Sequence, residues 1–463
     1  MRKNTTFGIG NVALLDKVNA RFDFFERVFK GVSTKAKNLK ESSKLFIYNR
    51  LEKCVSINRL KSVYPVELFE HLDFKSVPGD RTFYRDLERI GKHSKIIFAN
   101  YQGLLKKDNM VSEKQFVDFS SAYFEGNQSE MGKLGYSRDN QPGKKQVNFG
   151  ISTGINGIPC ALTIQKGNVQ DKKHMKFMLN TLKKVLPKKS LLIFDCGGNT
   201  KANKEKILNL RFNYLTLKAK KKKVYHRYIA LFNDGEKQKF SLNKRPYECV
   251  KLIEGKEIKY IFFCEDLKKD QINKRNKKFE KELIKNEGKL KKTKKGKVLG
   301  TYLSREGYIL AKGSLQEVLS EVKNPFITGL EGYFIIESSV DEIPEEILRN
   351  YKGRDKAEKL IRDMKEGTEL RPIRHWSTLA VIGYLLIIFL TNCIINLTLF
   401  LSRSPVVKNV KLLKKYLNNL TLTIVYPKNR FRFSILANIS EEIKPILGKF
   451  IQKYEDKSLE LRW

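Results

Sequence analysis

Five polar side chains between positions 351 and 365 follow the spacing of one face of an α-helix. The steps between them are three, four, four and three residues, which place them on a single narrow face beside an apolar flank: Tyr351, Arg354, Glu358, Arg362 and Lys365. One interpretation is a solvated face on which charges one turn apart form ion pairs. The other is a carboxylate, Glu358, that holds a metal ion among cations that bind phosphates.

Two further carboxylates come from segments with strand character. Asp118 lies in the middle of the expected strand 114–124, where aspartate is rare and where a buried carboxylate needs a partner charge or a metal. Asp195 follows the apolar run 191–194, and strand ends are where ligands bind in open α/β sheets, although an aspartate there also often caps a helix. With Glu358, these residues predict an oxygen-ligand site for Mg²⁺ or Mn²⁺ rather than for zinc.

The elements that would position these carboxylates follow one another in the order strand, strand, strand, helix, strand, helix, strand. The expected segments are 114–124, 144–154, 159–168, 171–186, 190–198, 203–211 and 212–220. A strand at 330–338 and a long helix over 340–367, which carries Glu358, come after an insertion. This order predicts an α/β fold with a ribonuclease H-like catalytic core.

The insertion, residues 221–329, has a different composition and predicts a β-rich basic subdomain. Two of its segments, 224–242 and 247–266, predict β-hairpins that turn at Asn-Asp-Gly and Glu-Gly-Lys. A lysine-rich helix is expected over 268–297, with more strands after it. Its charge suits contacts with a phosphate backbone.

Residues 1–110 have mostly helical periodicity. Two expected helices, 64–72 and 80–93, are joined by a Pro-Gly turn, and the second carries three arginines one turn apart: Arg81, Arg85 and Arg89. The pair resembles a helix-turn-helix with a groove-reading second helix. The alternative is an ordinary helical hairpin in a basic protein.

The charge of the chain favours a polyanionic partner. Its 463 residues include 91 Lys+Arg against 50 Asp+Glu, a formal net charge of +41, and nucleic acid is the first candidate. A coding bias toward A·T-rich codons explains part of this lysine excess, but not all of it. The hydrophobic content of 41% indicates a folded protein, and the six cysteines contain no CxxC pair that would indicate zinc or a disulfide scaffold.

The segment 379–401 is apolar over more than twenty residues and qualifies by length as a membrane span. Both of its flanks are basic, so they define no orientation. A single span near the end of a highly basic chain would be unusual, and we expect instead a central helix of a large globular core.

These features together resemble the DDE transposases of insertion sequences that carry the YREK signature (the insertion sequence four-like superfamily). The signature is Tyr, two residues, Arg, three residues, Glu, six residues and Lys, and it is matched without a spacing error by Tyr351, Arg354, Glu358 and Lys365. The stretches "DFSSAYFE", "LGYSRDNQPGKKQVNFGI", "EGYFIIES" and "RPIRHWSTLAVIGYLLIIFL" are also similar to segments of that family. The resemblance covers about residues 111–400, with an insertion between the second Asp and the Glu as in the family.

The resemblance implies that two Mg²⁺ (or Mn²⁺) ions are held by the catalytic residues Asp118, Asp195 and Glu358. The implied reaction is in-line displacement at DNA phosphodiesters, first hydrolysis at the element end and then joining of the 3′-hydroxyl to target DNA. Arg354 and Lys365 would bind phosphates near the cut, and Tyr351 would contact a phosphate or stack on a base.

Other DNA contacts are expected on weaker grounds. Arg362 joins the phosphate-binding set by its helical spacing alone, and an ion pair with Glu358 or Glu366 is the alternative. Recognition of the terminal inverted repeats is expected from the helical N-terminal DNA-binding region, through the arginines of its second helix.

The implied partners are double-stranded DNA, as element ends and as target, and a second copy of the chain, because such transposases generally act as dimers on paired ends. No membrane is expected, and the implied location is the cytoplasm, at the nucleoid. The expected domains are 1–110 (DNA-binding), 111–220 (catalytic core, first part), 221–329 (insertion), 330–404 (core, second part) and 405–463 (C-terminal region).

Three alternatives to a transposase stay open at this point. A catalytically inactive copy could keep the fold and only bind DNA. A ribonuclease H-like nuclease could cleave DNA without strand transfer. A membrane protein could be anchored by residues 379–401.

Overall fold

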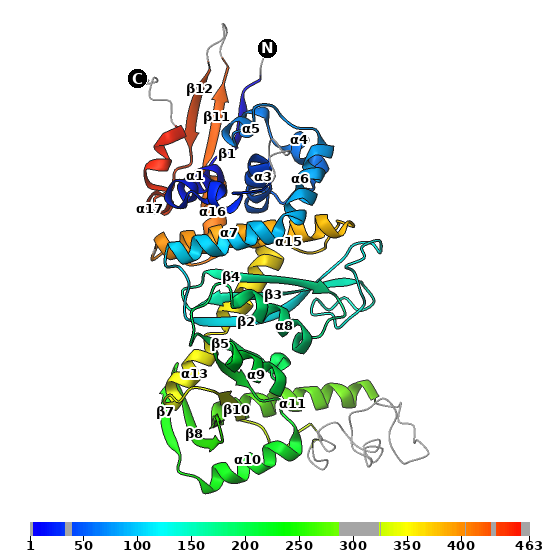
Figure 1. Ribbon diagram of the computed structural model, residues 1–463, viewed down its shortest axis with the longest axis vertical. Coiled ribbons are helices and arrows are strands. Elements are labelled where there is room, and N and C mark those ends of the chain that lie inside the picture. Colours follow the sequence, from blue (N-terminus) through cyan, green and yellow to red (C-terminus); the bar gives the residue numbers. More distant parts are fainter. Residues whose placement is uncertain are drawn as a thin grey trace. The chain divides into compact units, whose positions relative to one another are not determined.

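The structure is a computed structural model that describes residues 3–32, 39–286, 324, 326–402, 404–426 and 432–454. The chain folds into two compact units, whose elements are labelled in Figure 1. The first unit comprises Met1–Ile193, Thr200–Phe212 and Gly353–Trp463, and the second comprises Phe194–Asn199 and Asn213–Lys352. The strands expected after the lysine-rich helix, and the last part of that helix, lie outside the described residues.

The N-terminal part of the first unit is helical, as its periodicity predicts. Its helices are α1 (Gly10–Phe22), α2 (Phe24–Val28), α3 (Leu39–Leu51), α4 (Leu60–Val63), α5 (Val66–His71), α6 (Asp80–Lys92) and α7 (Ser94–Lys107). Helices α5 and α6 are the two expected between positions 64 and 93. The prediction of two short helices joined by a turn is therefore confirmed.

Four strands of the first unit lie in the order β4, β3, β2, β5. They are β2 (Lys114–Tyr123), β3 (Gln146–Gly154), β4 (Pro159–Lys166) and β5 (Leu191–Phe194). β3 pairs antiparallel with both β2 and β4, and Asp118 of β2 lies opposite Ile151 of β3. Helices α8 (Asp171–Leu182) and α9 (Lys201–Asn209) follow β4 and β5. The predicted order of strands and helices is confirmed for this stretch.

The long apolar segment forms α15 (Thr378–Ser402), which passes the length and composition test for a membrane span. Its most apolar 18-residue window is nevertheless 83% buried inside the protein. It packs against α3, α6, α7 and β4, and Figure 1 shows α7 lying along it. This burial supports the expected core helix over the membrane span.

Two glycines let α15 and α6 cross with their backbones in close approach. A Cβ atom added at Gly91 of α6 would lie 1.8 Å from the carbonyl oxygen of Leu379. A Cβ added at Gly383 of α15 would lie 2.1 Å from the carbonyl oxygen of Leu87. No side chain fits at either position unless the two helices move apart.

The two ends of the described chain meet in a small three-stranded sheet of the first unit. Strand β1 (Thr5–Gly8) pairs antiparallel with β11 (Thr421–Val425), which pairs with β12 (Phe433–Ala437). The C-terminal region also contains helices α16 (Val410–Asn419) and α17 (Lys444–Leu447). The first strand therefore depends on a strand more than 400 residues later for its backbone hydrogen bonds.

In the second unit five strands lie in the order β6, β10, β9, β8, β7, with every neighbouring pair antiparallel. They are β6 (Asn213–Leu217), β7 (Gln238–Leu242), β8 (Arg245–Glu254), β9 (Glu257–Phe263) and β10 (Tyr333–Ser338). The predicted hairpin over 247–266 is confirmed by β8 and β9. The lysine-rich helix is α11 (Glu265–Asn286).

The predicted hairpin over 224–242 is wrong, because most of this segment is a helix, α10 (Lys222–Asp234). The spacing of its buried aromatic residues explains the difference. Tyr225, Tyr228 and Phe232 follow at steps of three and four and pack into one apolar cluster with residues of β8, β9 and β10. Only the second half of the segment, β7, is a strand.

The single long helix predicted over 340–367 is also wrong, because this segment is interrupted. It consists of α13 (Pro344–Lys352) in the second unit, then α14 (Asp355–Arg362) and a π-helical turn, η4 (Asp363–Gly367), in the first. The interruption comes at Gly353, and glycine is disfavoured in a helix interior by about 1 kcal/mol relative to alanine. The signature tyrosine therefore lies on a different helix from the signature glutamate.

Candidate functional site

Asp118 is held on β2 by contacts that suit a half-buried carboxylate. Its Oδ1 accepts a hydrogen bond from the backbone N–H of Phe119 at 2.9 Å. The same oxygen lies 3.8 Å from Nη1 of Arg354. The aspartate therefore has the partner charge that its mid-strand position requires.

Arg354 links this strand to the signature glutamate. It occupies the N-cap position of α14, and its Nη2 lies 2.5 Å from Oε1 of Glu358, one turn further along. The Arg354 side chain is largely buried, whereas the Glu358 side chain is 51% exposed. One guanidinium thus contacts two carboxylates that are distant in sequence, and one of these carboxylates is open to solvent.

The Asp118–Glu358 pair fits a cation site with oxygen ligands, because the two carboxylates already share one positive group. Carboxylate oxygens are the ligands that Mg²⁺ and Mn²⁺ prefer. In the described ranges, no group of three or more His, Cys, Asp or Glu side chains could hold a metal ion. The expected set of three carboxylates therefore stays a prediction.

Asp195 belongs to the second unit, where it directly follows β5. Its Oδ1 accepts a hydrogen bond from the backbone N–H of Cys196 at 2.7 Å, so it caps the short 3₁₀ turn Cys196–Gly198. The hydroxyl of Tyr351, in the same unit, donates to the same oxygen at 3.4 Å. The structure thus brings together the second aspartate and the signature tyrosine, a pairing that helical spacing did not predict.

A buried glutamate that the sequence reasoning missed lies on the same unit. Glu337 of β10 is 2% exposed, and its carboxylate accepts hydrogen bonds from Lys218 at 2.6 Å and from Asn199 at 2.7 Å. Asn199 comes four residues after Asp195, so these bonds tie the segment after the aspartate to the sheet. A charged residue inside the apolar run "YFIIES" was the available signal.

Lys365 is placed in the interior of the first unit. Its Nζ lies 2.7 Å from Oδ1 of Asp139, and the two side chains are 7% and 2% exposed. Arg371 contacts the same carboxylate oxygen. Burial lowers the pKa of the Lys365 amine, while Asp139 acts in the opposite direction. In this conformation the lysine holds the loop of Asp139 against η4, and its predicted contact with phosphate stays a prediction.

The three arginines of α6 are not equivalent. Arg81 and Arg85 are exposed and form no ion pair with any residue that the structure describes. Arg89 lies 2.9 Å from buried Asp86 on its own helix. The opposite face of α6 packs on α15. Two of the three predicted DNA-binding arginines are therefore available to a partner.

Arg362 is exposed at the end of α14 and lines a cavity of about 930 Å³ in the first unit. Lysines from α14 and from the start of α16 line the same cavity. Neither of the ion pairs proposed for Arg362, with Glu358 or with Glu366, is formed in the structure. Its predicted contact with phosphate remains a prediction.

Comparison with known proteins does not identify a family for this chain. No protein-family model and no curated protein matches it. Among solved structures, it is similar to a cryo-EM structure of the piggyBac transposase synaptic complex with hairpin DNA, at 11% sequence identity and a TM-score of 0.43, over 97% of this chain and 80% of that chain. A likeness this distant does not determine a family, so the functional conclusion depends on the residues described above.

Proposed function

We propose that this chain is a DDE transposase of an insertion sequence, which binds terminal inverted repeats, cleaves DNA and joins the 3′-hydroxyl ends to target DNA. The observation that carries the proposal is the contact of Arg354 with both Asp118 and Glu358. These residues match the signature spacing and the first-strand aspartate of the resemblance. Metal-dependent cleavage of a phosphodiester needs carboxylates that hold the metal ions close together. The contact with Arg354 supports such a role for Asp118 and Glu358.

The proposed catalytic carboxylates are Asp118, Asp195 and Glu358. They would hold two Mg²⁺ or Mn²⁺ ions, which when bound stabilise the charge that develops on the attacking and leaving oxygens. The carboxylate of Glu358 is open to solvent and accessible to a DNA strand. Asp195 is oriented by its bonds to the Cys196 amide and the Tyr351 hydroxyl.

The surrounding groups have distinct proposed roles. Arg354 balances the charge of the two acids before DNA binds, and its planar guanidinium can donate two hydrogen bonds to a phosphate oxygen pair. Lys365, which holds the Asp139 loop in this structure, is a proposed phosphate contact together with Arg354. DNA is the proposed partner, with a second copy of the chain on the paired ends, at the nucleoid of the cytoplasm. The net charge of +41 supports this choice of partner.

The proposal is tested with the purified full chain and labelled DNA that carries the sequences flanking its own gene. With Mg²⁺ or Mn²⁺, we expect cleavage at the element ends and joining of the new 3′ ends to a target plasmid. Asp118→Asn, Asp195→Asn and Glu358→Gln should each lower both products at least 100-fold, because each removes a proposed metal ligand.

Asp355→Asn is the matched control for Glu358→Gln. Both acids lie in the first turn of α14, and Asp355 pairs with Lys359 at 2.5 Å as Glu358 pairs with Arg354. The control should retain activity. Cleavage without joining would indicate a nuclease instead. Binding without metal-dependent cleavage, unaffected by Asp118→Asn, would indicate an inactive relic.

A further inference from the structure

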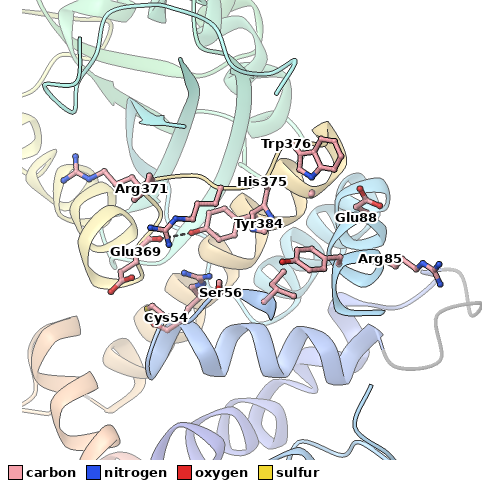
Figure 2. Close-up of a pocket in the computed structure, with 15 residues that line it drawn as sticks. Cys54, Ser56, Arg85, Glu88, Glu369, Arg371, His375, Trp376 and Tyr384 are labelled. Atoms are coloured by element: carbon pink, nitrogen blue, oxygen red, sulfur yellow. Dashed lines mark hydrogen bonds between the residues drawn. The ribbon is translucent and has the colours of Figure 1, made fainter. Parts of the chain in front are cut away.

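A cavity of about 500 Å³ in the first unit has the features of a binding site for a planar ligand. It lies between α6, the loop that follows α3, the segment 369–376 and the start of α15 (Figure 2). It contains none of the proposed catalytic residues. A single nucleotide is small enough for a cavity of this volume.

The edge of the cavity carries two large aromatic side chains that water reaches. Trp376 is 69% exposed and Tyr84 of α6 is 41% exposed. Neither ring contacts another aromatic ring or a cation within the described part of the chain. Aromatic faces exposed together at one cavity are costly in water, and a planar ligand that stacks on them would remove that cost.

The lining of the cavity includes a tilted pair of aromatic rings that is held in place. The ring centroids of His375 and Tyr384 lie 4.9 Å apart. The guanidinium carbon of Arg50 lies 5.0 Å from the ring centroid of Tyr384. The Tyr384 hydroxyl donates to the carbonyl oxygen of Glu369 at 2.8 Å. Burial, with a smaller effect of Arg50, lowers the pKa of His375 to about 4, so its ring is neutral at pH 7 and can exchange hydrogen bonds with a neutral base.

A cation at the edge of the cavity suits a phosphate. Arg85 is exposed and has no ion pair with a described residue, and Figure 2 shows its side chain extending away from Tyr384. The other exposed arginine of this edge, Arg374, is bound to Glu125 at 2.6 Å. The carboxylate Glu88 is held by the Ser377 hydroxyl at 2.7 Å. Of the two exposed arginines that line the cavity, Arg85 is therefore the one that is not bound to a described carboxylate and can bind a phosphate next to a stacked base.

We infer that this cavity binds one unpaired nucleotide, with its base stacked on Trp376 and Tyr84 and its phosphate on Arg85. Stacking on aromatic side chains is how proteins bind bases without pairing, and every base offers a face for it. A base inside a duplex has both faces covered by its neighbours, so duplex DNA should not enter. The nucleotide could belong to a single strand or be free. The inference goes beyond the proposed function and does not need its catalytic carboxylates.

The test uses the fluorescence of Trp376. The chain has two tryptophans, so Trp463→Phe leaves Trp376 as the reporter in the full-length protein. We expect quenching on titration with a single-stranded octadeoxynucleotide and less than one-tenth of that quenching with the corresponding duplex. Deoxyadenosine monophosphate is the probe for a free nucleotide, and inorganic phosphate is the probe for an anion alone.

Two variants separate stacking from general charge. Tyr84→Ala should weaken binding of the single strand about 5- to 150-fold, the range for loss of one base–aromatic stack. Tyr136→Ala, which removes an 84% exposed tyrosine elsewhere, should leave it unchanged. In binding measured by anisotropy of a labelled strand, Trp376→Phe should retain affinity and Trp376→Ala should lose it.

The outcomes either support or overturn the inference. Quenching by the strand or by the monophosphate supports a nucleotide site and identifies which source is bound. Equal quenching by duplex or by phosphate, no quenching at all, or equal effects of the two tyrosine variants overturns it. Because Asp118→Asn should quench like the parent chain, failure of this inference is distinguishable from failure of the proposed catalysis.

Discussion

Replacement of Gly383 by alanine should loosen the crossing of α6 and α15 and destabilise the first unit. The added Cβ would lie 2.1 Å from the carbonyl oxygen of Leu87 and 3.0 Å from the amide nitrogen of Gly91. Both are backbone atoms of a packed helix, so the helices must separate by about 1 Å. Overpacking of this kind costs about 1–3 kcal/mol, and the better helix propensity of alanine returns about 1 kcal/mol. The expected net loss is about 0–2 kcal/mol.

Gly103→Ala is the matched control. Gly103 is an exposed helical glycine of α7, and a Cβ there would meet nothing within 4 Å. It should therefore gain about 0.5–1 kcal/mol from propensity alone.

The free energy of unfolding of both variants is measured by urea titration at 25 °C, followed by the far-ultraviolet helix signal of the full chain. If Gly383→Ala proves as stable as Gly103→Ala, the close backbone approach of the two helices does not exist as described. A loss for both variants would instead refute the propensity argument, since nothing obstructs a methyl group at position 103.

Three further predictions concern charge. Asp139→Ala should lower the free energy of unfolding, measured in urea, by about 3–5 kcal/mol, because it leaves buried Lys365 without its counter-charge. A loss below 1 kcal/mol would contradict this. Burial raises the pKa of Asp363 from 3.8 to about 6, so the native state binds this proton more tightly and stability falls as the pH rises from about 4 to 6. Asp363→Asn should abolish this fall of Tm with rising pH. An unchanged pH dependence of Tm would exclude Asp363 as its source. In DNA titrations, Arg81→Ala and Arg85→Ala should each reduce the slope of log K against log salt by about 0.9, whereas Arg89→Ala, paired on its own helix, should not change it.

Local patterns were sufficient for elements whose burial repeats at a fixed period. In β2, β3 and β4, apolar residues either alternate with polar ones or form a continuous run of strand length, and this pattern predicts strands. The four-residue step from Arg354 to Glu358 likewise predicts their ion pair. The helix α10 could have been recognised as well, because its buried aromatic residues follow helical steps. There the Asn-Asp-Gly sequence favoured a hairpin, and the packing of the aromatic side chains against the sheet decided otherwise.

Pairings between distant segments had no local signal. The ion pair of Lys365 with Asp139 joins residues 226 positions apart, and neither side chain shows by type that it will be buried. The interruption at Gly353 was hidden by a regular spacing that continues across it. The contact of Tyr351 with Asp195 joins residues 156 positions apart, and the expected continuous helix gave no signal for it.

The pairing of β1 with β11 has a consequence for how the protein is made. Residues near position 5 find their hydrogen-bonding partners only near position 424, so on the ribosome this sheet stays incomplete until about 420 further residues have been added. A separately expressed fragment of residues 1–110 would lack β11 altogether, and its first strand would present an unsatisfied edge. Attempts to isolate the arginine-bearing helix as a free-standing module should therefore retain the segment that contains β11, supplied in the same chain or as a second fragment.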